Sequence, residues 1–168
     1  LIGMNQSATK MYENQRAWNF DVDGLGYRYH LSNPHAAMGL AQLAKMPLIT
    51  RTRRLACRLY SNLLRDIPEV TVPASDFVDV TPFLYYIRVP EKCRDKFRAH
   101  LTANGIDTGV HWQPGHHFSL FAKAKSSSLQ VTDKISKEIV SLPLHSNMSE
   151  ETVEFIASTI NDFFIESR

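Results

Sequence analysis

The chain has few of the residues that build cross-linked or metal-bound frameworks. Its 168 residues include two cysteines, Cys57 and Cys93, and neither has a partner at the spacing of a metal site. Both lie in segments with helical patterning, where a small apolar side chain packs well. We therefore expect two reduced thiols, buried or half-buried, in a cytoplasmic protein.

Long apolar runs and an excess of charge of one sign are also lacking. No segment approaches the roughly 20 apolar residues that a membrane-spanning helix needs. The formal net charge is +2, which is too small to favour nucleic acid or an anionic membrane by itself. With 43% hydrophobic and 21% charged residues, the composition is that of an ordinary globular domain. We expect neither a nucleic-acid nor a membrane partner.

The most informative stretch is residues 26–43, with the sequence GYRYHLSNPHAAMGLAQL. Asn33 is placed to cap a helix, and Pro34 suits the first helical position because its missing N–H costs nothing there. The residues that follow are mostly small, which lets another backbone approach the helix closely. Residues 27–30, shortly before the cap, form an aromatic and charged loop of the kind in which functional groups tend to concentrate.

Hydrophobic periodicity and turn residues predict helices that alternate with a few short strands. The expected helices cover residues 34–45, 48–66, 91–103 and 132–139, and a last one begins after the cap Ser149. The expected strands cover residues 69–73, 82–89, 107–112 and 140–142. This order favours an α+β fold, in which a small, mainly antiparallel sheet is covered by helices.

Prolines and glycines set several of the expected boundaries. Pro47 separates the first two helices, because a proline disfavours helical geometry in the residue before it. Asn104 and Gly105 supply a left-handed stop for the helix at 91–103. The last helix is expected to bury one apolar face, made of Phe155, Ile156, Ile160, Phe163 and Phe164.

The expected helix at 48–66 is rich in arginine. Its members are Arg51, Arg53, Arg54, Arg58 and Arg65. A basic helix face can bind nucleic acid, but these arginines spread around the polar face and no aromatic platform accompanies them. We therefore expect a solvated helix face.

Three histidines, His111, His116 and His117, mark the first place to look for a metal. A zinc site needs three or four converging ligands, and no cysteine or acidic residue stands nearby in a recognised spacing. We therefore expect no metal here, and a surface or packing role for His117.

Several stretches, taken in order, match the motifs of one family. Residues 36–43 (AAMGLAQL) match a small-residue helix, and residues 109–116 (GVHWQPGH) match a strand-and-loop element. Residues 141–145 (SLPLH), followed by residues 148–153 (MSEETV), match a closing segment and last helix. The chain thus resembles, over nearly its whole length, the DegT/DnrJ/EryC1/StrS family of pyridoxal-phosphate-dependent sugar aminotransferases.

This resemblance implies the small C-terminal domain of a fold-type-I aminotransferase. Residues 1–33 would be a linker and interface segment that follows a large domain, and residues 34–168 would be the small domain. The full-length parent would be a homodimer. By resemblance, it would use pyridoxal 5'-phosphate (PLP) to transfer an amino group from an amino-acid donor, glutamate, to a keto group of a nucleotide-linked sugar.

The resemblance also implies roles for five residues. Arg28 and His30 would contact the cofactor phosphate across the dimer interface, although the commonest form of the family has Asn and Arg at these positions. Arg28 carries a fork of donors that suits a phosphate. Tyr27, His111 and His116 would lie near the sugar substrate, where an imidazole can donate or accept a hydrogen bond.

No catalytic residue is assigned within this chain. PLP chemistry needs a Schiff-base lysine, and no lysine here lies in a segment like the family's Ser-x-x-x-x-Lys stretch. A glycine-rich phosphate loop is also missing. We therefore expect the chain alone to be inactive and not to hold PLP. Two alternatives stay open: a dehydratase of the same family, with histidine in place of the lysine, and a non-catalytic binding or regulatory module.

Overall fold

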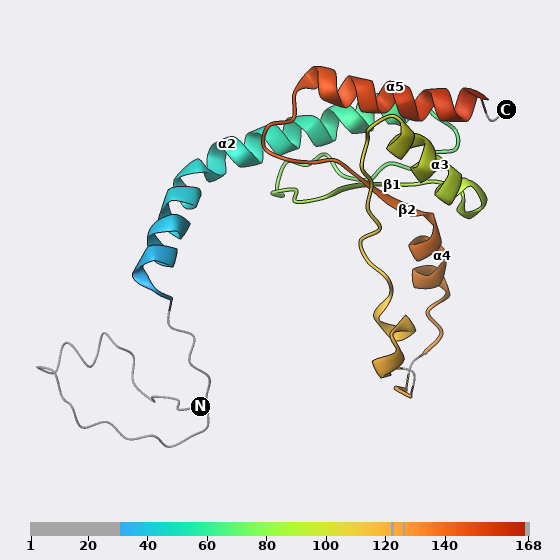
Figure 1. The fold of residues 1–168 in the computed structure, drawn as a ribbon, viewed down its shortest axis with the longest axis horizontal. Coiled ribbons are helices and arrows are strands. Elements are labelled where there is room, and N and C mark those ends of the chain that lie inside the picture. The colour runs from blue at the N-terminus through green and yellow to red at the C-terminus, as the bar shows by residue number, and fades with distance from the viewer. Residues whose placement is uncertain (1–30, 122, 126, 167–168) are drawn as a thin grey trace, which may run out of the picture. The chain divides into compact units, whose positions relative to one another are not determined.

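The computed structural model describes residues 31–121, 123–125 and 127–166. The chain divides into two compact units, Leu1–Ala44 and Lys45–Arg168. Figure 1 shows the labelled elements. The helices are α2 (Asn33–Leu64), α3 (Glu91–Ala103), α4 (Gln130–Glu138) and α5 (Glu150–Glu166), with short 3-10 helices η1 (Gly115–His117) and η2 (Ser119–Phe121). The strands are β1 (Tyr85–Arg88) and β2 (Ile139–Leu142).

Helix α2 runs unbroken through Pro47, so the expected division into two helices at 34–45 and 48–66 is wrong. A proline inside a helix removes one backbone N–H donor but leaves the turns on either side able to form. The second half of α2 buries Tyr60 and Leu64, and this packing favours helix beyond the proline. At the other end, Asn33 is the first helical residue rather than the cap. The carbonyl of Ser32, one position earlier, accepts the N–H of Ala36 at 2.9 Å.

The sheet is antiparallel, as expected. Strand β1 pairs with β2 in a register that places Tyr85 opposite Leu142 and Arg88 opposite Ile139. A single bridge extends each side, Thr71 against Arg88 and Gly109 against Ser141. The strands expected at 69–73 and 107–112 are thus reduced to single bridges.

Competing hydrogen bonds explain the loss of the strand at 107–112. Arg98 donates from Nε to the Thr108 hydroxyl and from Nη2 to the Thr108 carbonyl, both at 3.1 Å. The N–H of Thr108 is bonded to the side chain of Asp107 at 2.9 Å. Both backbone groups of Thr108 therefore have partners outside a strand ladder. At 69–73, Pro73 has no N–H to continue the pairing.

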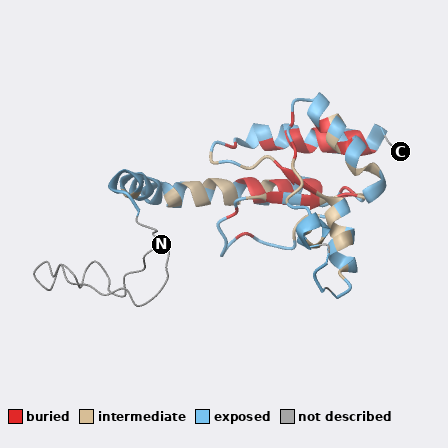
Figure 2. Cartoon of the chain, turned by 60° about the horizontal axis from the view of Figure 1, so that its bottom comes forward, coloured by how far each residue is buried: buried red, intermediate tan, exposed pale blue. Residues whose placement is uncertain are grey.

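The core lies between the strands and the helices of the second unit. Figure 2 shows the buried residues gathered on the strands, on the C-terminal half of α2 and on α5. Tyr60 of α2 stacks on Tyr85 of β1 with ring centroids 4.9 Å apart. Phe97 of α3 meets Phe163 and Phe164 of α5 at 5.3 and 5.5 Å. Together with the other buried apolar residues, these rings belong to one hydrophobic core that includes three helices and the sheet.

Most of the helix ends predicted from capping and turn residues are confirmed. Helix α3 has the expected bounds, and Gly105 after it has a φ of 76°, the left-handed conformation that ends a helix. The Ser149 hydroxyl accepts the N–H of Thr152 at 3.2 Å and so caps α5 as expected. Phe155 was wrongly placed in the buried face of α5, because it is 53% exposed. It lies beside the stripe formed by the buried residues, which recur every three or four positions.

Among the residues that the structure describes, no helix is both long enough and apolar enough to cross a membrane.

Candidate functional site

The loop that carries Tyr27, Arg28 and His30 lies outside the described residues. The roles assigned to these three side chains therefore stay predictions. The described part of the candidate site consists of the residues from Thr108 to Phe121, together with β2 and α4.

His111 is held against β2. Its Nδ1 lies 2.9 Å from the hydroxyl oxygen of Ser141, which is buried. Gly109 makes this position possible, because a Cβ there would lie 2.9 Å from Nδ1 and closer still to Cε1 of the same imidazole. Only glycine therefore lets the ring fold back over the backbone at this point.

A shallow cavity of about 310 Å³ opens beside His111. Thr108, Ser141 and Pro143 contribute to its wall. Trp112, the next residue, is 64% exposed and stacks on Phe83 with ring centroids 6.4 Å apart. His111 thus stands at a cavity whose wall is partly polar and partly apolar, beside exposed aromatic rings, a combination that suits a ligand with hydroxyl groups.

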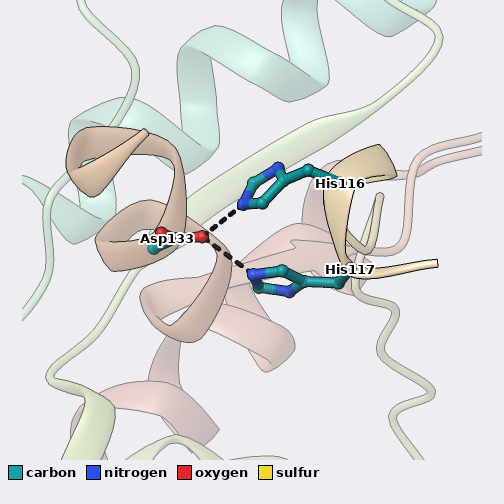
Figure 3. A group of neighbouring side chains, drawn as sticks. All are labelled: His116, His117 and Asp133. Carbon is teal, nitrogen blue, oxygen red and sulfur yellow. Dashed lines mark hydrogen bonds and ion pairs between the residues drawn. The ribbon is translucent and has the colours of Figure 1, made fainter. Parts of the chain in front are cut away.

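His116 and His117 do not share the surroundings of His111; they are consecutive residues of η1. Both imidazoles point at one carboxylate of α4, as Figure 3 shows. Nε2 of His116 lies 2.7 Å and Nε2 of His117 lies 2.9 Å from the same oxygen, Oδ1 of Asp133. A hydrogen bond from His116 lowers the pKa of Asp133 below its ordinary value. The positive charge of His116 and the contact with His117 lower this pKa further.

Contacts with its neighbours fix α4, and with it Asp133. Arg94 of α3 donates to the carbonyl of Ser136 at 2.8 Å. Arg88 of β1 donates from Nε to Glu138 at 3.0 Å. The last turns of α4 are therefore tied to the sheet and to α3, and Asp133 is presented to the loop that contains η1.

Sequence reasoning missed Asp133 as a partner of the histidines. It lies 17 residues beyond His116, and no fixed spacing links a loop histidine to a helix carboxylate. The expected surface or packing role of His117 is incomplete as well, since His117 also pairs with Asp133. The one local feature that marked Asp133 was its place in the first turn of a helix, where a negative charge interacts favourably with the helix dipole.

Three arginines of α2 donate hydrogen bonds to backbone carbonyls and are therefore not only solvated. Arg53, Arg54 and Arg58 donate to the carbonyls of Pro82, Val80 and Asp76 at 3.2, 2.7 and 2.9 Å. The expectation of a purely solvated face is therefore wrong for these three. Their guanidinium groups hold residues 76–82, the segment that leads into β1.

The α+β fold of this chain is that of the small domain of an aminotransferase, as the solved structures described below show. Residues 1–161 match the sequence model of the DegT/DnrJ/EryC1/StrS aminotransferase family, and the chain belongs to this family. The resemblance noted in the sequence motifs is thereby confirmed.

Two similar proteins are named for biosynthesis, one of a spore coat polysaccharide and one of pseudoaminic acid. The spore coat polysaccharide biosynthesis protein SpsC of Bacillus subtilis is 26% identical over 171 residues, which cover 96% of this chain and 44% of SpsC. The solved structure of Helicobacter pylori PseC, an aminotransferase involved in the biosynthesis of pseudoaminic acid, is 25% identical. It has a TM-score of 0.79 and matches 89% of this chain and 42% of PseC.

A third similarity concerns the fold alone. The aminotransferase TlmJ of Streptoalloteichus hindustanus is 24% identical, with a TM-score of 0.78 over 92% of this chain and 42% of TlmJ. The chain thus spans less than half the length of the relatives that it matches.

Proposed function

We propose that the protein to which this chain belongs aminates a keto group on a nucleotide-linked sugar. Glutamate is the proposed donor of the amino group, and PLP the proposed cofactor. The observation that carries this proposal is the family match over residues 1–161, with relatives that act in polysaccharide and pseudoaminic acid biosynthesis. The position of His111 in the wall of a cavity that also contains Thr108 and Ser141 supports it.

The described lysines do not fit the role of the cofactor lysine. All are exposed: Lys45, Lys92, Lys96, Lys123, Lys125, Lys134 and Lys137. A lysine that forms a Schiff base needs an enclosed position next to the cofactor ring. We therefore derive no step through PLP from these residues, and propose that a large domain supplies the lysine and that this chain alone is inactive.

His111 has the role of orienting the sugar in this proposal. Its Nδ1 is engaged by the Ser141 hydroxyl, which can donate or accept, so Nε2 stays available in either tautomer. Nε2 would hydrogen-bond a sugar hydroxyl, and the buried serine would keep the ring from turning away. His116 is placed similarly, since its Nε2 faces Asp133 and its Nδ1 is the atom left for substrate.

The cofactor contacts belong to the segment at residues 1–33 in this proposal. Arg28 and His30 would reach the cofactor phosphate in the other subunit of a homodimer, and Tyr27 would lie near the sugar. Arginine binds a phosphate through paired N–H donors, which makes Arg28 the stronger of the two.

The test uses the whole protein supplied with PLP, glutamate and a keto nucleotide-sugar. Formation of 2-oxoglutarate and of the amino-sugar are measured together. We expect both products in equal amounts. His111→Ala should raise KM about threefold to tenfold, because this is the loss of binding that corresponds to the free energy of one neutral hydrogen bond. Lys96→Ala, an exposed change on α3, is the matched control and should leave KM unchanged.

The alternatives give different results. A dehydratase would consume the nucleotide-sugar without producing 2-oxoglutarate. A binding or regulatory module would bind the nucleotide-sugar and leave it unchanged. Either result would refute the proposed transamination.

A further inference from the structure

We propose that His116, His117 and Asp133 form a binding site for a divalent transition-metal ion, with zinc as the natural occupant. The three side chains come from η1 and α4, and Figure 3 shows them converging. The inference goes beyond the proposed transamination and does not depend on it.

The convergence of the ligand atoms is the first argument. One ring nitrogen of each histidine and one carboxylate oxygen of Asp133 all lie within 4.8 Å of one another. Both imidazoles are aimed at the same oxygen, Oδ1, at 2.7 and 2.9 Å. The two histidines are consecutive residues of η1, and their ring centroids lie 4.3 Å apart.

The second argument is that a metal ion fits between these atoms with a small adjustment. With tetrahedral bonds of about 2.0–2.2 Å from zinc to nitrogen and oxygen, neighbouring ligand atoms lie about 3.3–3.5 Å apart. Oδ1 of Asp133 would need to withdraw by about half an ångström from each imidazole to reach this spacing. Asp133 can do so, because its side chain is 41% exposed.

The ligand chemistry indicates which ion would bind. Two imidazoles and one carboxylate suit zinc and neighbouring transition metals, whereas magnesium and calcium prefer oxygen ligands only. The histidine side chains are 25% and 41% exposed, so an ion can enter from solvent and water can complete its coordination. The geometry therefore resembles an open three-ligand site rather than a closed structural one.

The consequence of binding would be a cross-link between two segments. The loop around η1 is joined to α4 by the contacts with Asp133, and an ion held by all three residues would replace these contacts with metal–ligand bonds. Since the ion binds only the folded arrangement, it should raise the thermal stability of the protein.

The test is a titration of the full chain with zinc, without a histidine tag or a chelating buffer. Isothermal titration calorimetry measures the binding, and scanning calorimetry measures the Tm with and without zinc. We expect one zinc ion per chain, bound in the micromolar range, and a higher Tm in its presence. Titration with Co²⁺ should produce visible absorption bands of a low-coordinate site. X-ray absorption of the zinc form should show imidazole nitrogens at about 2.0–2.1 Å.

Two variants and one control decide the assignment. His117→Ala and Asp133→Asn should each weaken zinc binding at least about tenfold, because each removes a direct ligand. Both positions are partly exposed, so the variants should fold. His145→Ala removes an exposed histidine outside the site and should bind zinc like the unaltered chain.

The proposal is refuted if the unaltered chain binds no zinc, or if either variant binds it as tightly as the control. His117 is replaced rather than His116 because His116 is a proposed substrate contact. Loss of zinc binding and loss of transamination can therefore be observed separately.

Discussion

Phe97 should be one of the side chains on which the stability of the second unit depends most. It is fully buried in α3 and meets Phe163 edge-on and Phe164 face-on, at 5.3 and 5.5 Å between ring centroids. Phe97→Ala removes the buried ring and leaves a cavity that rigid neighbours fill only in part. Substitutions of this kind cost about 3–5 kcal/mol. Because whole domains are stable by about 5–15 kcal/mol, this one change should remove a large share of the total.

Urea unfolding followed by circular dichroism measures the effect. With a slope of about 2 kcal/mol per molar urea, a loss of 4 kcal/mol lowers the midpoint by about 2 M. Phe155→Ala is the matched control, since it deletes the same ring from a position on α5 that is 53% exposed. This control should lower the free energy of unfolding by less than about 0.5 kcal/mol. Equal shifts for the two variants would refute the packing described here.

The remaining predictions concern titratable groups. Burial raises the pKa of the Cys57 thiol to about 12 and also raises the pKa of the half-buried Cys93 thiol. Alkylation at pH 8 should therefore wait for unfolding at Cys57 and should be slow but measurable in the folded chain at the more accessible Cys93; equal native rates would contradict this. The hydrogen bonds from His116 and His117 lower the pKa of Asp133 in the folded state, so its ionised form stabilises the fold. This stabilisation is complete above the carboxyl's unfolded pKa and is lost as the pH falls through the lowered folded value. In the presence of EDTA, Asp133→Asn should remove this part of the acid dependence of the urea midpoint, and an unchanged pH profile would count against the pairing.

Features governed by neighbouring residues could be read from the sequence. Helix α3, the left-handed Gly105 after it and the Ser149 cap each depend on contacts within a few residues. The antiparallel α+β fold also followed from the order of the patterns and from the family motifs.

Features that depend on competition between partners could not be read in this way. Pro47 was expected to end a helix, but the packing of Tyr60 and Leu64 favours helix beyond it. The strand at 107–112 was expected from its composition, but the side chain of Arg98 takes the carbonyl that a strand partner would need. In both cases a residue distant in the sequence, or a packed face, outweighed a local preference.

The sequence by itself determined the family and the α+β class, because these follow from motifs and from the order of residue patterns. Only the tertiary structure decided that His111 turns to Ser141 while His116 and His117 meet on Asp133. The reason is physical: the position of Asp133 depends on two hydrogen bonds that hold α4. Arg94 of α3 bonds Ser136, which is 42 positions away in the sequence, and Arg88 of β1 bonds Glu138, which is 50 positions away. No local spacing encodes such a meeting, and the metal site that we propose there depends on it.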